Sequence, residues 1–83
     1  MAEPVICAVA RTPVGKFRGA LRSHSATHLG AVAVMELLQR AGIEPDSDTV
    51  EELIFGHVLQ AGAGQAPARQ VAIFAGLPYT TPC

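Results

Sequence analysis

The chain has 83 residues, enough for one small domain that buries only roughly 60–65% of its unfolded surface. Its formal net charge of −1 argues against bulk electrostatic binding to a nucleic acid or a membrane. With two cysteines and no predicted secretory signal, transit peptide or membrane span, a cytoplasmic protein without a disulfide framework is expected.

The first predicted element is a strand at residues 5–10, a continuous apolar run typical of a strand covered on both faces. After a loop, Ser25 can cap a helix that runs to about Ala41, where Gly42 supplies a left-handed stop. Small residues dominate the predicted buried face, so we expect this helix to lie close against its neighbour. That face comprises Ala26, Gly30, Ala33, Val34, Leu37 and Ala41, and the opposite face carries His28, Glu36 and Gln39.

The second half of the chain repeats this order. Residues 53–60 predict another buried strand, and Pro67 and Gly76 delimit a helix over residues 67–75. Residues 79–83 begin a further element. Strands that alternate with helices favour an α/β fold, with a parallel sheet and right-handed crossovers.

The charged residues are segregated along the sequence, with a basic group before the first helix and an acidic group after it. They form either two solvated loops of opposite sign or, for the basic group, a surface that faces an anion. The basic group is Arg11, Lys16, Arg18 and Arg22, and the acidic group is Glu44, Asp46, Asp48, Glu51 and Glu52.

Two glycine motifs fall short of nucleotide-binding signatures. The pair Gly62 and Gly64 needs a third glycine at position 67 for a dinucleotide fingerprint, and Pro67 stands there. The dipeptide Gly15-Lys16 lacks the first glycine of a phosphate-binding loop, because position 10 is alanine. Neither motif therefore predicts a nucleotide site.

The histidines and cysteines predict no catalytic or metal site. His24 and His28 have the spacing of a zinc helix, but Ser25 stands where such a helix has its general-base glutamate. His57, in an apolar strand, is interpreted as a hydrogen-bonded core histidine. Cys7 is expected to be inert packing in the first strand, and Cys83 has no histidine placed to activate it.

The sequence contains three further motifs, which are considered together. The first is Ala10-Arg11-Thr12-Pro13 with Gly15-Lys16-Phe17 and Gly19. The second is Gly56, Val58 to Gly62, Gly64-Gln65 and Ala68-Arg69-Gln70, and the third is Gly76-Leu77-Pro78. In this order and spacing, they resemble the signatures of the thiolases, the family of acetyl-CoA acetyltransferases and 3-ketoacyl-CoA thiolases. His57 departs from the pattern, since many members carry asparagine there, and we expect it to tune a loop contact.

The resemblance implies a five-layered α-β-α-β-α fold. Residues 1–83 would be the incomplete first portion of its N-terminal domain, with βαβα units on a mostly parallel sheet. Thiolases transfer acyl groups between coenzyme A thioesters through a cysteinyl thioester. The resemblance thus implies acyl-CoA substrates, no tightly bound cofactor and a homo-oligomer, either dimer or tetramer, with no nucleic-acid or membrane partner.

Carried over residue by residue, the resemblance assigns no catalytic, cofactor-binding or metal residue. In the family, the nucleophile follows a few residues after the position matched by Cys83. Arg69 is expected to anchor its helix by hydrogen bonds rather than touch substrate. A coenzyme A phosphate contact by Arg11, Lys16 and Arg18 is the weaker alternative to solvated charges. Residues 5–10 and 53–60 would be neighbouring strands.

Two other functions stay open at this stage. The chain could be a small interaction module derived from the thiolase N-terminal domain, or a thiol-dependent enzyme that uses Cys83. With only two complete strands to cover the small-residue faces of the helices, we expect the isolated chain to be molten or to aggregate.

Overall fold

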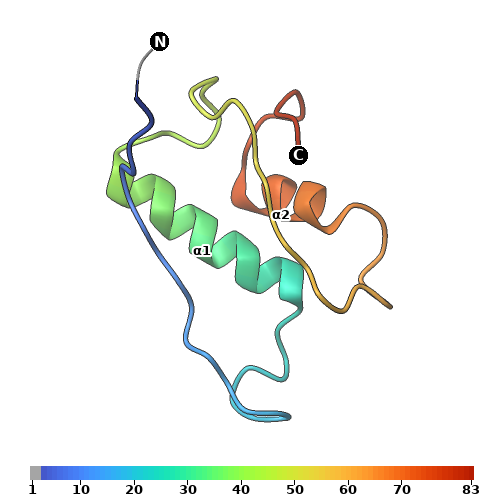
Figure 1. Cartoon of the computed structure of the whole chain (residues 1–83). Helices are drawn as coiled ribbons and strands as arrows, with labels where there is room; N and C mark the ends of the chain where they lie inside the picture. Colours follow the sequence, from blue (N-terminus) through green and yellow to red (C-terminus); the bar gives the residue numbers. More distant parts are fainter. Residues whose placement is uncertain (1–2) are drawn as a thin grey trace.

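The structure, a computed structural model, describes residues 3–83. In this range it contains two helices, α1 (Ala26–Ala41) and α2 (Pro67–Ala75), and extended or turning segments run around them (Figure 1). Both helices lie where the sequence predicts them. Between residues 3 and 83 no segment is a strand, so the predicted parallel sheet at residues 5–10 and 53–60 is not confirmed.

Helix α1 begins and ends as its capping residues dictate. The Ser25 hydroxyl accepts a hydrogen bond from the backbone N–H of His28 at 3.2 Å, which satisfies a free donor of the first turn. Gly42 has φ of 72° and donates its N–H to carbonyls of the last turn. In that turn, Arg40 pairs with Glu36 at 2.8 Å and also donates to the carbonyl of Val9 at 2.8 Å. The first extended segment is thereby tied to the end of α1.

Helix α2 begins at a proline and ends at a glycine. Pro67 occupies its first turn, where the missing N–H costs nothing, and Gly76 closes the helix at φ of 87°. The residue before the helix, Ala66, is also left-handed, with φ of 44° and no side-chain cap. A sharp reversal of the chain therefore precedes α2.

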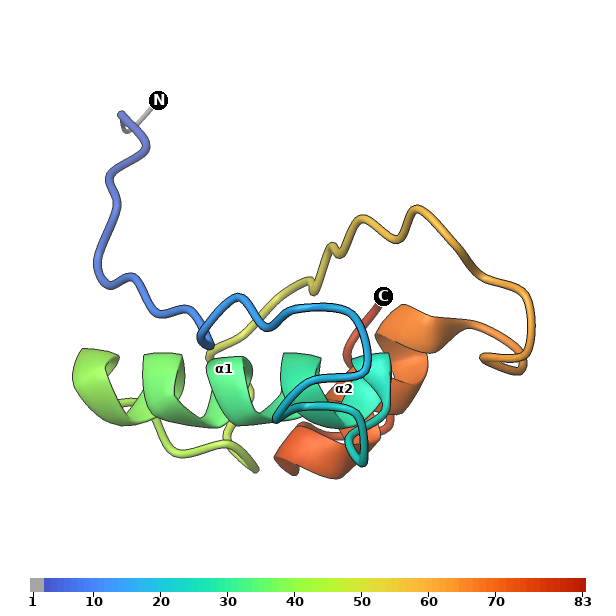
Figure 2. The same ribbon diagram turned by 90° about the horizontal axis from the view of Figure 1, so that it is seen from below.

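The two helices pack against each other and form the core (Figures 1 and 2). Gly30 permits their close approach, because a Cβ at this position would lie 2.9 Å from the Val71 Cγ2 atom. The buried apolar residues are Ala31, Val34 and Leu38 of α1, Val71, Ala72 and Ala75 of α2, and Leu77 after it. Close packing through small residues is confirmed.

The predicted buried face of α1 is confirmed only in part. The most buried residues of α1 are Thr27, Ala31, Val34 and Leu38, which share only Val34 with the predicted set. Of the others, Gly30, Ala33, Leu37 and Ala41 are half-buried and Ala26 is exposed. Gly30 lies against Val71 of α2, whereas Val34, Leu37 and Ala41 line the groove beneath the extended segments.

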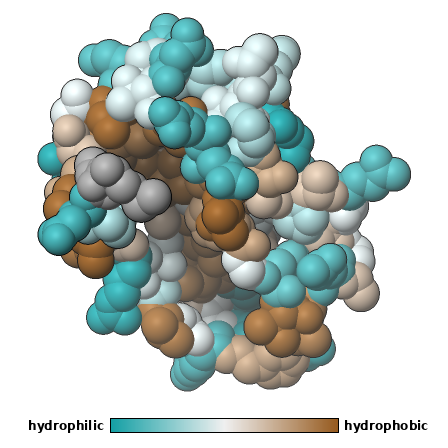
Figure 3. All heavy atoms as spheres, turned by 45° about the horizontal axis from the view of Figure 1, so that its top comes forward, coloured by the Kyte–Doolittle hydropathy of each residue, from teal (hydrophilic) through white to brown (hydrophobic). Residues whose placement is uncertain are grey.

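The two apolar runs are extended segments without a covering layer. Their side chains are largely exposed, with Ile6 at 86% and Val58 at 94%, and Cys7 is exposed rather than packed. No hydrogen bond joins the two segments, so they are not neighbouring strands. Instead, a groove of about 350 Å³ separates residues 5–8 from residues 50–53, over an α1 floor that includes Val34 and Leu37. Figure 3 shows hydrophobic atoms around a hollow on this side.

The physical reason for the missing sheet is the lack of pairing partners. A strand is stabilised by hydrogen bonds to a neighbouring strand, and each of these segments has open edges. A single backbone hydrogen bond connects the second segment to the end of the chain: the Leu53 N–H donates to the Pro82 carbonyl at 2.9 Å. The apolar runs correctly mark segments suited to burial, but residues 3–83 do not supply the cover.

Hydrogen exchange should show that residues 54–60 lack the backbone hydrogen bonds of a sheet. In the 83-residue chain, we expect the amides of residues 54–60 to exchange within about tenfold of an unstructured peptide, because buried backbone hydrogen bonds confer the protection. The amides of residues 31–38, inside α1, should exchange more slowly. Mass spectrometry of peptic fragments would measure both in one sample. Equal or stronger protection in residues 54–60 would contradict the open arrangement.

Candidate functional site

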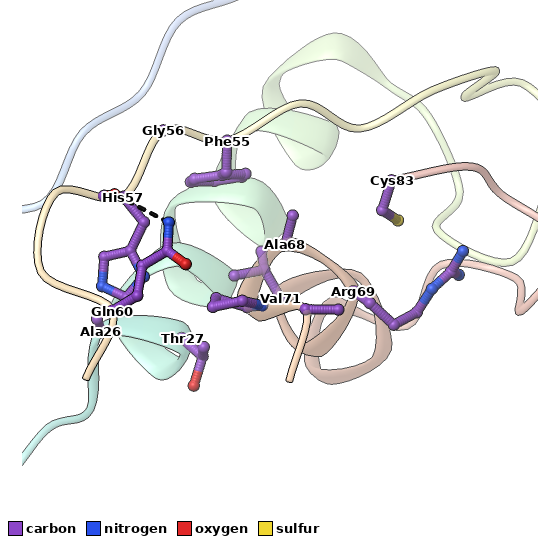
Figure 4. A pocket seen from close by; sticks show the side chains of 12 residues that line it. Ala26, Thr27, Phe55, Gly56, His57, Gln60, Ala68, Arg69, Val71 and Cys83 are labelled. Carbon is purple, nitrogen blue, oxygen red and sulfur yellow. Dashed lines mark hydrogen bonds between the residues drawn. The ribbon is translucent and has the colours of Figure 1, made fainter. Parts of the chain in front are cut away.

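The polar residues around the glycine-rich turn gather at a cavity of about 220 Å³. It lies between the first residues of α1, the first residues of α2 and the segment over residues 55–60 (Figure 4). The polar or titratable side chains that line it are those of Thr27, His57, Gln60, Arg69 and Cys83. This is the place where residues distant in the sequence meet.

Among the side chains that line this cavity, His57 has a polar atom without a hydrogen-bond partner. Its ring is half-buried, and its Nδ1 atom is buried with no hydrogen-bond partner in the structure. The prediction that His57 is a hydrogen-bonded core histidine is therefore wrong for its Nδ1 atom. The backbone of His57 is better held, since the Gln60 Nε2 atom donates to its carbonyl at 3.4 Å (Figure 4).

Arg69 links α2 to the last segment of the chain. Its Nη1 atom donates to the Tyr79 carbonyl at 3.2 Å. This hydrogen bond confirms the expected anchoring role of Arg69, whereas its lack of contact with substrate stays a prediction.

Gln70 has a role that the sequence interpretation missed. Its Nε2 atom donates to the carbonyls of Ala63 at 2.8 Å and Gln65 at 2.9 Å. These bonds hold the glycine-rich turn against α2. The available signal was an amide one turn after a proline helix start, where it can reach back to the carbonyls of the preceding turn.

Both cysteines, Cys7 and Cys83, are free thiols. Cys83 is exposed, and the Sγ atom donates to the Thr81 carbonyl at 3.4 Å. No hydrogen bond joins Cys83 to His57, and activation of a thiol needs a base within such reach. Within residues 3–83, no group of three His, Cys, Asp or Glu side chains is arranged to hold a metal ion.

The other candidates lie away from the cavity. His24 precedes α1, and His28 stacks on Phe74 of α2, with ring centroids 4.5 Å apart. Arg11, Lys16 and Arg18 are exposed on the loop before α1 and do not line the cavity. Over residues 3–83, neither helix is long and apolar enough to cross a membrane.

Together, these contacts define a scaffold in which side chains of α2 hold the turn before it and the segment after it. A family model described as the thiolase N-terminal domain matches residues 4–83. The chain belongs to the thiolase family.

Named relatives agree with this assignment. The chain is 53% identical to the cytosolic acetyl-CoA acetyltransferase of Gibberella zeae over 75 residues, which cover 90% of this chain and 18% of that protein. It is 51% identical to the mitochondrial acetyl-CoA acetyltransferase of Xenopus tropicalis over 80 residues, 96% of this chain and 19% of that protein. The chain thus spans about a fifth of the length of these curated relatives.

A solved structure supports the fold. The Acat5 thiolase of Ascaris suum, solved in complex with coenzyme A, superposes with a TM-score of 0.87 and 39% sequence identity. The match covers 93% of this chain and 20% of that protein. The helices and extended segments are therefore placed as in a thiolase, although the chain forms no sheet between residues 3 and 83.

Proposed function

We propose that residues 1–83 form the first portion of the N-terminal domain of a thiolase acyltransferase. The reaction is the reversible transfer of an acyl group between coenzyme A thioesters, through a thioester on a cysteine that follows Cys83 in the complete enzyme. In this proposal, no residue of the chain is catalytic, and its task is to position the strand that carries the nucleophile.

The observation that carries the proposal is the anchoring of residues 79–83. The Leu53 N–H binds the Pro82 carbonyl at 2.9 Å, and Arg69 binds the Tyr79 carbonyl at 3.2 Å. Thr81 is buried between these two points. A strand continued from Cys83 would leave this anchored segment in a fixed direction, and a reacting thiolate needs such fixed positioning to approach the face of the substrate carbonyl.

An assay of acetoacetyl-CoA thiolysis tests the proposal. We expect no activity above the uncatalysed rate from the 83-residue chain, and turnover from the same chain joined to the remaining thiolase segments of a relative. The matched control is the joined chain with Cys83→Ala, which should keep its activity because Cys83 is not the nucleophile. Thiolysis by the 83-residue chain, or its loss in the Cys83→Ala control, would contradict the assignment.

The proposal extends to partners and compartment. Acyl-CoA thioesters are the substrates of the complete enzyme, with no tightly bound cofactor, and the enzyme is a homo-oligomer. We retain the cytoplasm as the predicted compartment, although relatives with similar identity carry both cytosolic and mitochondrial names.

A further inference from the structure

His57 carries a buried atom that the proposed function does not use. Over residues 3–83, its Nδ1 atom is the one buried side-chain nitrogen or oxygen without a hydrogen-bond partner. A buried polar atom is costly unless it is paired, and the great majority of such atoms in folded proteins are paired. Any further chain that packs on these residues can only increase the burial of Nδ1. The need for a partner therefore holds in a longer protein as well.

The ring is suited to accept a hydrogen bond at this atom. The Arg69 side chain lines the same cavity and no carboxylate does, so nothing in the lining stabilises a positively charged imidazole. A neutral imidazole has one N–H and one accepting nitrogen. Nε2 is not buried and unpaired in this way, so it can carry the N–H and donate to solvent. Nδ1 is then the acceptor, and its partner must be a donor.

The last residues of the chain lead toward this atom. Pro82 is level with Leu53, because the Pro82 carbonyl accepts a hydrogen bond from the Leu53 N–H at 2.9 Å. Cys83 then lines the cavity together with residues 55–57, on the side opposite His57 (Figure 4). The two segments therefore run in the same direction. Where both advance by about 3.3 Å per residue, the fourth residue after Pro82 comes level with His57.

We propose that a hydrogen-bond donor of the segment directly after Cys83 binds His57 Nδ1 in the complete protein. This inference rests on the proposed function, in which the chain continues from Cys83 to the nucleophile. Coenzyme A is the alternative occupant, but the cavity of about 220 Å³ falls below the roughly 300–1,000 Å³ of typical ligand pockets. His57 is thus a positioning residue, which holds the segment that leads to the reacting thiolate.

Thermal unfolding of the complete natural chain tests the contact by the sign of the change. His57→Leu should lower the unfolding midpoint by roughly 3 °C or more, because the donor is left unpaired. His57→Asn, whose amide branches at the same carbon as Nδ1, should stay within about 1 °C of the parent. If Nδ1 had no partner, leucine would remove a buried unpaired atom, and the midpoint would stay unchanged or rise. That result would overturn the proposal.

Kinetics separate positioning from a merely structural role. In the thiolysis assay, His57→Leu should lower kcat roughly tenfold or more and leave KM within about threefold, because the thiolate is misplaced while binding is kept. His57→Asn should keep kcat within about threefold of the parent. The matched control is His24→Leu, at an exposed histidine before α1, which should change neither constant by more than about twofold. An unchanged kcat in His57→Leu, or an equal loss in His57→Asn, would contradict the positioning role.

The two proposals fail separately. A parent chain without thiolysis would contradict the acyltransferase function, and the unfolding midpoints of the His57 variants would still decide the contact. An active parent whose His57→Leu variant equals it in midpoint and in kcat would refute the contact and leave the acyltransferase function standing.

Discussion

Gly30→Val is expected to lower the free energy of unfolding of the α1–α2 pair by about 2–3 kcal/mol. The first added carbon would lie 2.9 Å from Val71 Cγ2 and 3.5 Å from Phe55 Cε1, and valine adds two further methyl groups. Glycine and valine both rank low in helix propensity, so packing decides the outcome. Urea unfolding, followed by the helical circular-dichroism signal, measures the loss.

The control for this substitution is Gln39→Val, which introduces the same side chain on the exposed face of α1. We expect a change below about 1 kcal/mol there, since no neighbour must move. If both variants unfold at the same urea concentration, a valine costs no more at the helix contact than on the exposed face. The close approach at Gly30 would then have no energetic weight.

Leu38→Ala is expected to cost about 3 kcal/mol, within the usual range for a buried leucine truncated to alanine. Leu38 is 5% exposed and sits in a core that, over residues 3–83, has only seven buried apolar residues, so few neighbours can close the space that it leaves. A domain of this length has a free energy of unfolding of about 4–12 kcal/mol at most. The loss should therefore shift the urea midpoint strongly.

Leu59→Ala supplies the matched comparison, because Leu59 is 83% exposed. The same deletion there should change stability by no more than about 0.5 kcal/mol. A large effect at Leu59 would show that residues 53–60 are packed against something in solution. Equal small effects at both positions would contradict this prediction and would mean that the isolated helix pair lacks a fixed core, as expected from the sequence alone.

The helices could be predicted because their signals are local. Ser25, Gly42, Pro67 and Gly76 set the ends through hydrogen bonds and backbone angles that involve only nearby residues. The buried stripe of α1 was harder to place, since a face of small residues can pack on a helix or lie beneath a sheet. In the structure, α1 packs against α2, and Leu37 and Ala41 line a groove beneath the extended segments rather than a sheet.

The sheet and the cavity depend on contacts between residues that are far apart in the sequence, and no local pattern predicts such contacts. An apolar run indicates suitability for burial, but strand assignment requires a partner at hydrogen-bonding distance. The cavity needed α1, α2 and residues 55–60 to be positioned together before the unpartnered nitrogen of His57 could be recognised. The anchoring role of Arg69 could be predicted, and its hydrogen bond to the Tyr79 carbonyl confirms it.

The groove between residues 5–8 and 50–53 has a consequence for biosynthesis. All residues of the helix pair core lie between Ala31 and Leu77, so the pair can assemble as soon as Leu77 has left the ribosome. At about 5–20 residues per second, the apolar groove then stays open until a segment that covers it has been synthesised. During that interval the nascent chain presents an apolar surface to solvent, which is the kind of surface that makes a folding intermediate prone to aggregate.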